Sequence, residues 1–112
     1  MGTKYSYKCK NCDYSVVTSA GHDYGMLAVT DTYICASCKE LVDVSVGIYG
    51  QTYSKEEIFK KGLEKEFGFG FYECPECNSG ENLIPWDGNK KPCPKCGSKI
   101  KKDKEGIEIL WD

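Results

Sequence analysis

Eight cysteines are the residues of this sequence best suited to specific chemistry, and they occur as four Cys-x-x-Cys pairs. Two cysteines separated by two residues can turn both sulfur atoms toward one point, and two such pairs complete a tetrahedral site for Zn²⁺. Four pairs therefore supply ligands for two closed zinc sites. The pairs are Cys9 with Cys12, Cys35 with Cys38, Cys74 with Cys77, and Cys93 with Cys96.

The spacing favours consecutive pairing of these knuckles, as each Cys-x-x-Cys turn is called below. Twenty-two residues separate the first knuckle from the second, 15 separate the third from the fourth, and 35 lie between the two sets. Pairing the first with the third and the second with the fourth would close loops of 61 and 54 residues. That arrangement costs about 2 kcal/mol more in closure entropy, which favours consecutive sites and leaves a cross-braced arrangement open.

The second set has the stronger zinc signature, Cys74-Pro-Glu-Cys77 and Cys93-Pro-Lys-Cys96-Gly97. Proline after the first cysteine and glycine after the second favour a tight turn, because Gly97 is free to take a positive φ. The first set is looser, with Asp13 and Lys39 in place of a small residue. These motifs resemble the zinc-ribbon superfamily, including its tandem ribbons. The resemblance implies short β-hairpin knuckles and binding to nucleic acid or protein.

Cys-x-x-Cys pairs also occur in two other kinds of cysteine chemistry. In rubredoxin-like proteins, two similar knuckles bind one iron ion that transfers electrons. Four sulfur ligands do not exclude iron, but we favour zinc for this sequence. A dithiol oxidoreductase needs a thioredoxin-like βαβ context, which this sequence lacks. A closed four-sulfur site has no coordination position for a substrate water. We therefore expect a non-enzymatic binding module with two Zn²⁺ ions and no small-molecule substrate.

The compartment expected for these thiols is the reducing cytoplasm. Residues 1–10 are polar and contain no apolar signal-peptide core, and no stretch approaches the roughly 20 apolar residues of a membrane span. Units of about 50 residues bury too little surface to be stable alone, so we expect the bound metal to stabilise them as well.

The elements that must position the knuckles are mostly strands. Alternating apolar residues over 42–48 predict a half-buried strand that leaves the second knuckle. Shorter strands are expected over 5–8, 14–17, 27–29 and 32–34, with 107–111 closing the second unit and 19–25 forming a loop. The expected fold is a small metal-bound α+β protein, mostly β. Its predicted parts are a zinc-ribbon-like unit over 1–50, a helical spacer over 51–72 and a second ribbon over 73–112.

One helix is predicted, from Lys55 to about Glu66. Ser54 and Glu57 match a capping box, and apolar residues recur at helical spacing from Ile58 onward. Gly68 is expected to end the helix.

Two surfaces are candidates for a partner. The strip Phe67, Phe69 and Phe71 alternates with glycines and could stack bases or receive a peptide, although packing as shared core is favoured. The second candidate is a basic cluster near Trp86 that suits phosphate contact. Its lysines are Lys90, Lys91, Lys95, Lys99, Lys101 and Lys102.

Charge limits what these surfaces could do. The net charge of −2 argues against coating nucleic acid through bulk charge, and the absence of arginine removes the planar fork used to read guanine. His22, beside Asp23, invites a general-base interpretation, but a solvated loop histidine is the simpler one. The partner is therefore expected to be a protein or a nucleic acid, not a membrane.

Overall fold

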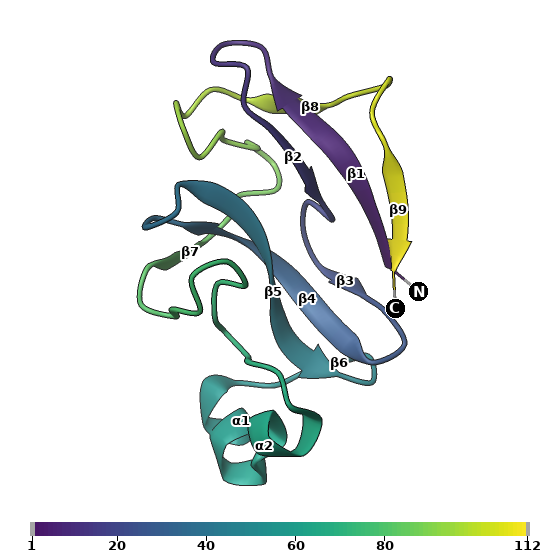
Figure 1. Cartoon of the computed structure of the whole chain (residues 1–112), viewed down its shortest axis with the longest axis vertical. Helices are drawn as coiled ribbons and strands as arrows, with labels where there is room; N and C mark the ends of the chain where they lie inside the picture. The colour runs from purple at the N-terminus through teal and green to yellow at the C-terminus, as the bar shows by residue number, and fades with distance from the viewer. Residues whose placement is uncertain (1, 112) are drawn as a thin grey trace.

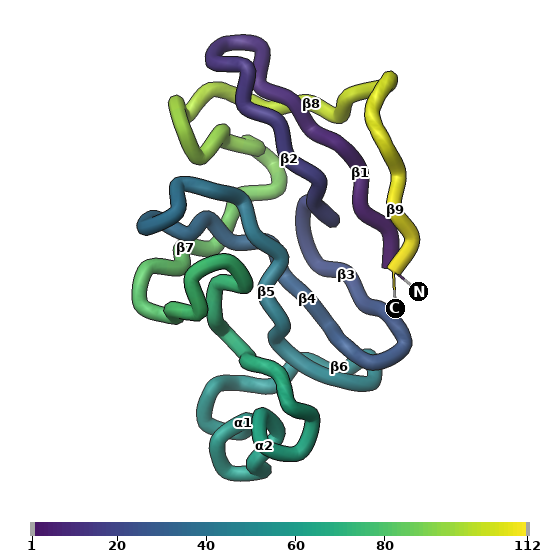
Figure 2. The backbone as a smooth tube through the Cα atoms, in the orientation of Figure 1, coloured from purple at the N-terminus to yellow at the C-terminus, as the bar shows by residue number. Residues whose placement is uncertain are grey.

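Two antiparallel β-sheets carry the four knuckles, in a computed structural model that describes residues 2–111 (Figures 1 and 2). The terminal sheet is built on β1 (Gly2–Cys9), which pairs along one edge with β2 (Ser15–Thr18). Along its other edge β1 pairs with β8 (Ile100–Lys102) and β9 (Glu108–Trp111). The first and last strands of the chain therefore lie side by side.

The central sheet is a long hairpin with short additions. Strands β4 (Ala28–Cys35) and β5 (Glu40–Ile48) form the hairpin, so the two strands predicted over 27–34 are one strand. On the other edge of β4 lie β3 (Asp23–Tyr24) and β7 (Leu83–Pro85), and β6 (Gln51–Thr52) pairs with β5.

The predicted helix is present but divided. Helix α1 (Lys55–Lys61) begins at the expected capping box between Ser54 and Glu57, and α2 (Leu63–Phe67) ends at Gly68. Gly62 has a left-handed backbone with φ of 63°, which interrupts the helix between them. The break allows Ile58 and Leu63 to pack together under the end of β5. Among residues 2–111 there is no helix with the length and hydrophobicity needed to cross a membrane.

The two sheets share one hydrophobic core. Tyr7 and Ile100 of the terminal sheet pack against Leu41 of β5 and against Trp86, which follows β7. Burying apolar surface between the sheets in this way is the main stabilising contribution available to so small a chain. The terminal sheet and the central hairpin therefore pack against each other through this cluster.

A buried carboxylate also joins the sheets. The Asp43 side chain on β5 is 5% exposed and lies 3.6 Å from Lys4 Nζ on β1. It accepts hydrogen bonds from the hydroxyl groups of Thr18 on β2 and Thr32 on β4, at 2.8 and 2.7 Å. The Ser19 N–H donates to its second oxygen at 3.1 Å. This network satisfies a charge that would otherwise be costly to bury.

Candidate metal centres

The terminal site joins the first knuckle to the fourth. Cys9 is the last residue of β1, and Cys93 precedes β8, which pairs with β1 beside it. The Sγ atoms of Cys9 and Cys96 lie 3.6 Å apart, as do those of Cys12 and Cys93. All four sulfurs lie within 4.8 Å of one another.

The central site joins the second knuckle to the third. Cys35 is the last residue of β4, and the loop before β7 brings Cys74 and Cys77 against it. The Sγ atoms of Cys35 and Cys77 lie 3.8 Å apart, and those of Cys38 and Cys74 lie 3.9 Å apart. These four sulfurs also lie within 4.8 Å of one another.

Both clusters have dimensions that suit a tetrahedral metal. A Zn–S bond of about 2.3 Å implies sulfurs about 3.8 Å apart at the corners of a regular tetrahedron. A disulfide would require about 2.05 Å, so the sulfur separations fit metal coordination and not oxidation. The eight cysteines are therefore two four-sulfur groups capable of holding a metal ion each.

All four knuckles have the same backbone conformation. In each, the N–H of the residue after the second cysteine donates to the carbonyl of the first, at distances from 2.8 to 3.0 Å. That residue has a positive φ in all four knuckles. The angles are 61° at Asp13, 53° at Lys39, 60° at Asn78 and 81° at Gly97. The first set, which the sequence marks as looser, is thus as regular as the second.

The expected consecutive pairing is wrong. The structure groups Cys9 and Cys12 with Cys93 and Cys96, and encloses the other two knuckles between them. The loops closed are 80 residues for the terminal site and 35 for the central one. Loop-closure entropy disfavours this nested order by only about 2 kcal/mol relative to consecutive pairing.

Strand pairing supplies the reason for the nested order. The segment 107–111, expected to close the second unit, pairs with β1 as β9, and β8 pairs with β1 next to Cys9. In the same way, Cys35 pairs with Leu83 of β7, just beyond the third knuckle. These long-range ladders and the core they enclose outweigh a small difference in closure entropy.

Hydrogen bonding gives each site one acidic thiol. The N–H of Ser98, followed by the Asn11 side chain, lowers the pKa of Cys96 to about 6. Burial raises the pKa of Cys35, but hydrogen bonds from the Cys38 N–H and neighbouring thiols outweigh it and lower the pKa to about 7. Hydrogen bonds to Cys35 and Cys77 raise the pKa of Cys38 to about 12. The positive charge of a bound metal would favour ionisation of the Cys38 thiol.

The aromatic residues proposed for partner binding are mostly core. Phe71 is buried with Ile58 and Leu63, and Phe67 and Phe69 pack partly buried against the same cluster. Their rings follow one another at 6.4 and 4.9 Å, around the turn after α2 and not along a flat strand. Trp86 is 8% exposed and donates from Nε1 to the Pro92 carbonyl at 2.9 Å, so its ring has no free face for a base.

The lysines proposed for partner binding lie on the surface around the terminal site. Lys95 is 3.7 Å from Glu40 and stands over the Tyr14 ring, whose hydroxyl donates to Glu40 at 2.6 Å. Burial and that hydrogen bond raise the pKa of Tyr14. Lys102 lies 3.5 Å from the Tyr5 ring centre. The remaining four are Lys90, Lys91, Lys99 and Lys101, of which Lys91 is half-buried and the others are exposed.

Sequence reasoning missed Asp43, which connects the two sheets. Asp43 lies in the strand predicted over 42–48, where alternation assigns it to a polar face, and its side chain contacts Lys4 of β1, Thr18 of β2 and Thr32 of β4. His22 is exposed and its Nδ1 lies 2.8 Å from Asp31 and not from a catalytic partner. A single charged residue between two valines is the one sequence signal that could have drawn attention to Asp43.

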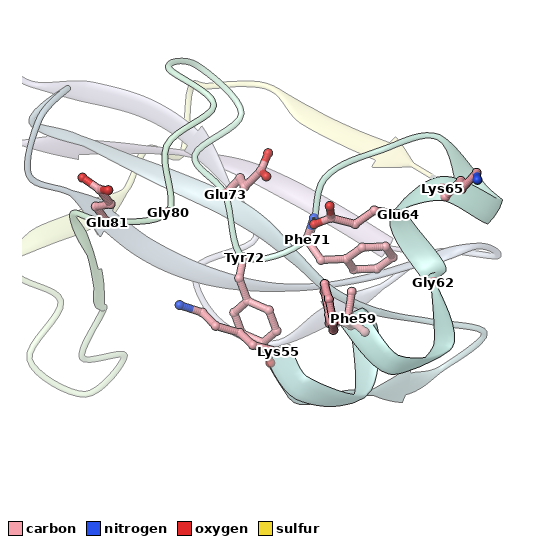
Figure 3. A pocket seen from close by; sticks show the side chains of 11 residues that line it. Lys55, Phe59, Gly62, Glu64, Lys65, Phe71, Tyr72, Glu73, Gly80 and Glu81 are labelled. Carbon is pink, nitrogen blue, oxygen red and sulfur yellow. The ribbon is translucent and has the colours of Figure 1, made fainter.

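A groove beside the helices has no cysteine in its lining. It has a volume of about 810 Å³ and lies between α1, α2 and the segment around Tyr72 (Figure 3). Figure 3 shows Phe59 and Phe71 at its helical end and Glu73 and Glu81 farther along the loop. Phe59 of α1 is 88% exposed. The lining contains no cysteine or histidine, so the groove shares no ligand with either site.

Searches of protein-family models, curated proteins and solved structures each returned no match to this chain.

Proposed function

We propose that this protein is a non-enzymatic interaction module whose fold depends on two structural zinc ions, one in each four-cysteine site. The observation that carries the proposal is the pair of closed four-sulfur clusters with tetrahedral dimensions. Because the protein fills all four ligand positions, the metal has no position for substrate and serves structure. A protein or nucleic acid is the proposed partner, and a reducing compartment such as the cytoplasm would keep the thiols available.

The nested arrangement makes zinc a strong contributor to folding. The terminal site ties β1 to the segment before β8, and the central site ties the β4–β5 turn to the segment before β7. Structural zinc contributes free energy of about 10 kcal/mol or more to the folded state. We expect the metal-free chain to be largely unfolded.

The experiment is elemental analysis of protein purified without added metal, followed by chelation. We expect two zinc ions per chain and loss of the folded state when a strong chelator removes them. Trp86 reports this directly, because its ring packs with Cys9 and Cys93 and its fluorescence should shift to longer wavelength on exposure. Trp111→Phe leaves Trp86 as the single tryptophan. A chelated protein that keeps a cooperative unfolding transition would contradict a structural role.

The same preparation tests the alternative of rubredoxin-like electron transfer. Four-sulfur sites also accept iron, and Cys12, Cys77 and Cys96 are exposed at the surface, where an electron could leave. A colourless protein with two zinc ions would exclude this alternative. A red, iron-loaded protein with a reversible redox couple would replace the zinc proposal.

A further inference from the structure

The pairing of β1 with β8 brings lysines from both ends of the chain onto one surface. Lys8 lies directly opposite Lys101 in the antiparallel register, and both side chains are exposed. Residues directly opposite each other project on the same face of a sheet. Lys99, two residues before Lys101 and extended at its bridge to Pro92, projects on that face as well. Lys10, in the adjoining knuckle, is also exposed.

This lysine surface, made of Lys8, Lys10, Lys99 and Lys101, forms no ion pair with an acidic side chain among residues 2–111. The ion pairs among residues 2–111 are Lys4 with Asp43, His22 with Asp31, and Lys95 with Glu40. Like charges placed directly opposite in a sheet are destabilising, so the Lys8–Lys101 pair costs stability unless an anion lies over it. The arrangement is what a binding surface for an external polyanion requires.

The folded molecule has a basic end and an acidic remainder, because the two ends of the chain meet at the terminal site. Residues 1–13 and 86–112, which meet at the terminal site, contain ten lysines and six acidic residues. The intervening residues 14–85 contain five lysines and 11 acidic residues. A polyanion would be attracted to the terminal end and repelled by the remainder, which orients the protein on approach.

We propose that the lysine surface binds the phosphate backbone of double-stranded nucleic acid without reading its sequence. This inference rests on the proposed function, because zinc in the terminal site holds the two knuckles together. Lys99 and Lys101 are about 6.6 Å apart along an extended chain, while each strand of a duplex carries one charge per about 3.4 Å. Neighbouring lysines can therefore each neutralise a separate phosphate.

The surroundings of the surface favour a duplex over other polyanions. Single-strand binding uses exposed aromatic rings on which bases stack, but Trp86 is buried and Tyr5 is half-buried under Lys102. Protein interfaces use apolar anchors, and the exposed apolar side chains near β9, which are Ile107, Ile109 and Leu110, lie beside the first part of β1 and not beside Lys8. The chain contains no arginine, the side chain that most often reads base edges. Contact between lysine and phosphate is therefore the main interaction available.

The experiment is a titration of the zinc-loaded full chain into a fluorescent 20-base-pair duplex, followed by anisotropy at several salt concentrations. A single strand of the same sequence, a duplex of unrelated sequence and a poly-glutamate peptide are the competitors. We expect both duplexes to compete equally and better than the single strand and the peptide. The affinity should fall steeply with salt, with a slope of about 0.9 for each phosphate contacted.

The test variant is Lys8→Gln/Lys99→Gln/Lys101→Gln, and its matched control is Lys55→Gln/Lys60→Gln/Lys65→Gln, which removes the same charge from the exposed lysines of α1 and α2. We expect the test variant to lose at least about tenfold in affinity at low salt and to reduce the salt slope by up to about 2.7. The control should change both by much less.

Three results would overturn the inference. They are no duplex binding at low salt, equal losses in the two variants, and tighter binding of the single strand or the acidic peptide. Measuring zinc in the same samples separates this failure from that of the proposed function. Two zinc ions without duplex binding would contradict only the proposal of a nucleic-acid surface. A protein without zinc would contradict the proposed function itself.

Discussion

At the scale of single residues, the position after each knuckle decides how easily the backbone closes around the metal. Lys39, Asp13 and Asn78 adopt the left-handed conformation that glycine adopts at Gly97. For Lys39 this conformation costs about 1–2 kcal/mol, whereas aspartate and asparagine adopt it more readily because their short polar side chains can hydrogen-bond locally. A bound metal and the local hydrogen bond to the first cysteine must hold these residues in place. Glycine at the fourth knuckle avoids this strain.

Gly97→Ala isolates that cost, because nothing lies within 4 Å of the added Cβ. Gly88→Ala is the control, since it also has open space and its φ is not in the left-handed region. We expect Gly97→Ala to lower the free energy of unfolding of the zinc-loaded protein by about 1 kcal/mol and Gly88→Ala to leave it unchanged or slightly raised. Urea denaturation measures both. Equal effects would mean that the turn does not require its left-handed residue.

Residue types were the most predictable feature of the sites. All eight cysteines of the knuckles lie in four-sulfur groups, as their spacing predicted. The conformation of Gly97 was also predictable, because glycine favours a positive φ. The same conformation at Lys39 was not, since its side chain carries no such preference. It follows from closing the knuckle and not from the identity of the residue.

At the scale of elements, the contact between the two sheets depends on a polar network as well as on apolar packing. Asp43 of β5 bonds to groups from β1, β2 and β4, and it has little exposure to water. Alternation predicted the strand over 42–48, but β3, β6, β7 and β8 were not predicted, and β3 lies within the segment 19–25 that was expected to be a loop. The partners of the strands were not predictable, because alternation describes the faces of one strand and says nothing of which strand lies beside it.

Asp43→Ala should be strongly destabilising, because it leaves the hydroxyl groups of Thr18 and Thr32 and the Lys4 ammonium without their shared acceptor. We expect a loss of about 3 kcal/mol in the free energy of unfolding. The control is Asp31→Ala, which removes a more exposed pair with His22 and should cost less than about 1 kcal/mol. Thermal or urea unfolding with zinc bound makes the comparison. Similar losses in the two variants would show that the network contributes little.

The ends of the helix were predictable from local residues, but its interruption was not. Ser54, Glu57 and Gly68 mark its ends by local chemistry, and all three act as predicted. Gly62 was counted within a single helix, since one glycine costs only about 1 kcal/mol there. The break is favoured by the packing of Leu63 beside Ile58 beneath β5. Because β5 lies outside the helix, the helix sequence alone does not predict this contact.

At the scale of the whole molecule, the nested order of the metal sites is open to a direct count. Cys12→Ser/Cys96→Ser removes two ligands from the terminal site alone, whereas Cys12→Ser/Cys38→Ser removes one ligand from each site. We expect the first variant to retain one tightly bound zinc and the second to retain none after dialysis against a chelator. Consecutive pairing predicts the reverse result. Elemental analysis with circular dichroism makes the measurement.

The sequence by itself determined which residues can hold metal, where the helix begins, which segments contribute to the longer strands, and that the lysines gather near one end. Those features depend on residue type and on spacing within a few positions of the chain. Only the tertiary structure decided that the first knuckle meets the fourth and that Lys8 faces Lys101. It also decided that Trp86 and Asp43 are buried between the sheets. Strand pairing and core packing between distant segments set these contacts, and closure entropy differs too little among the pairings to predict them.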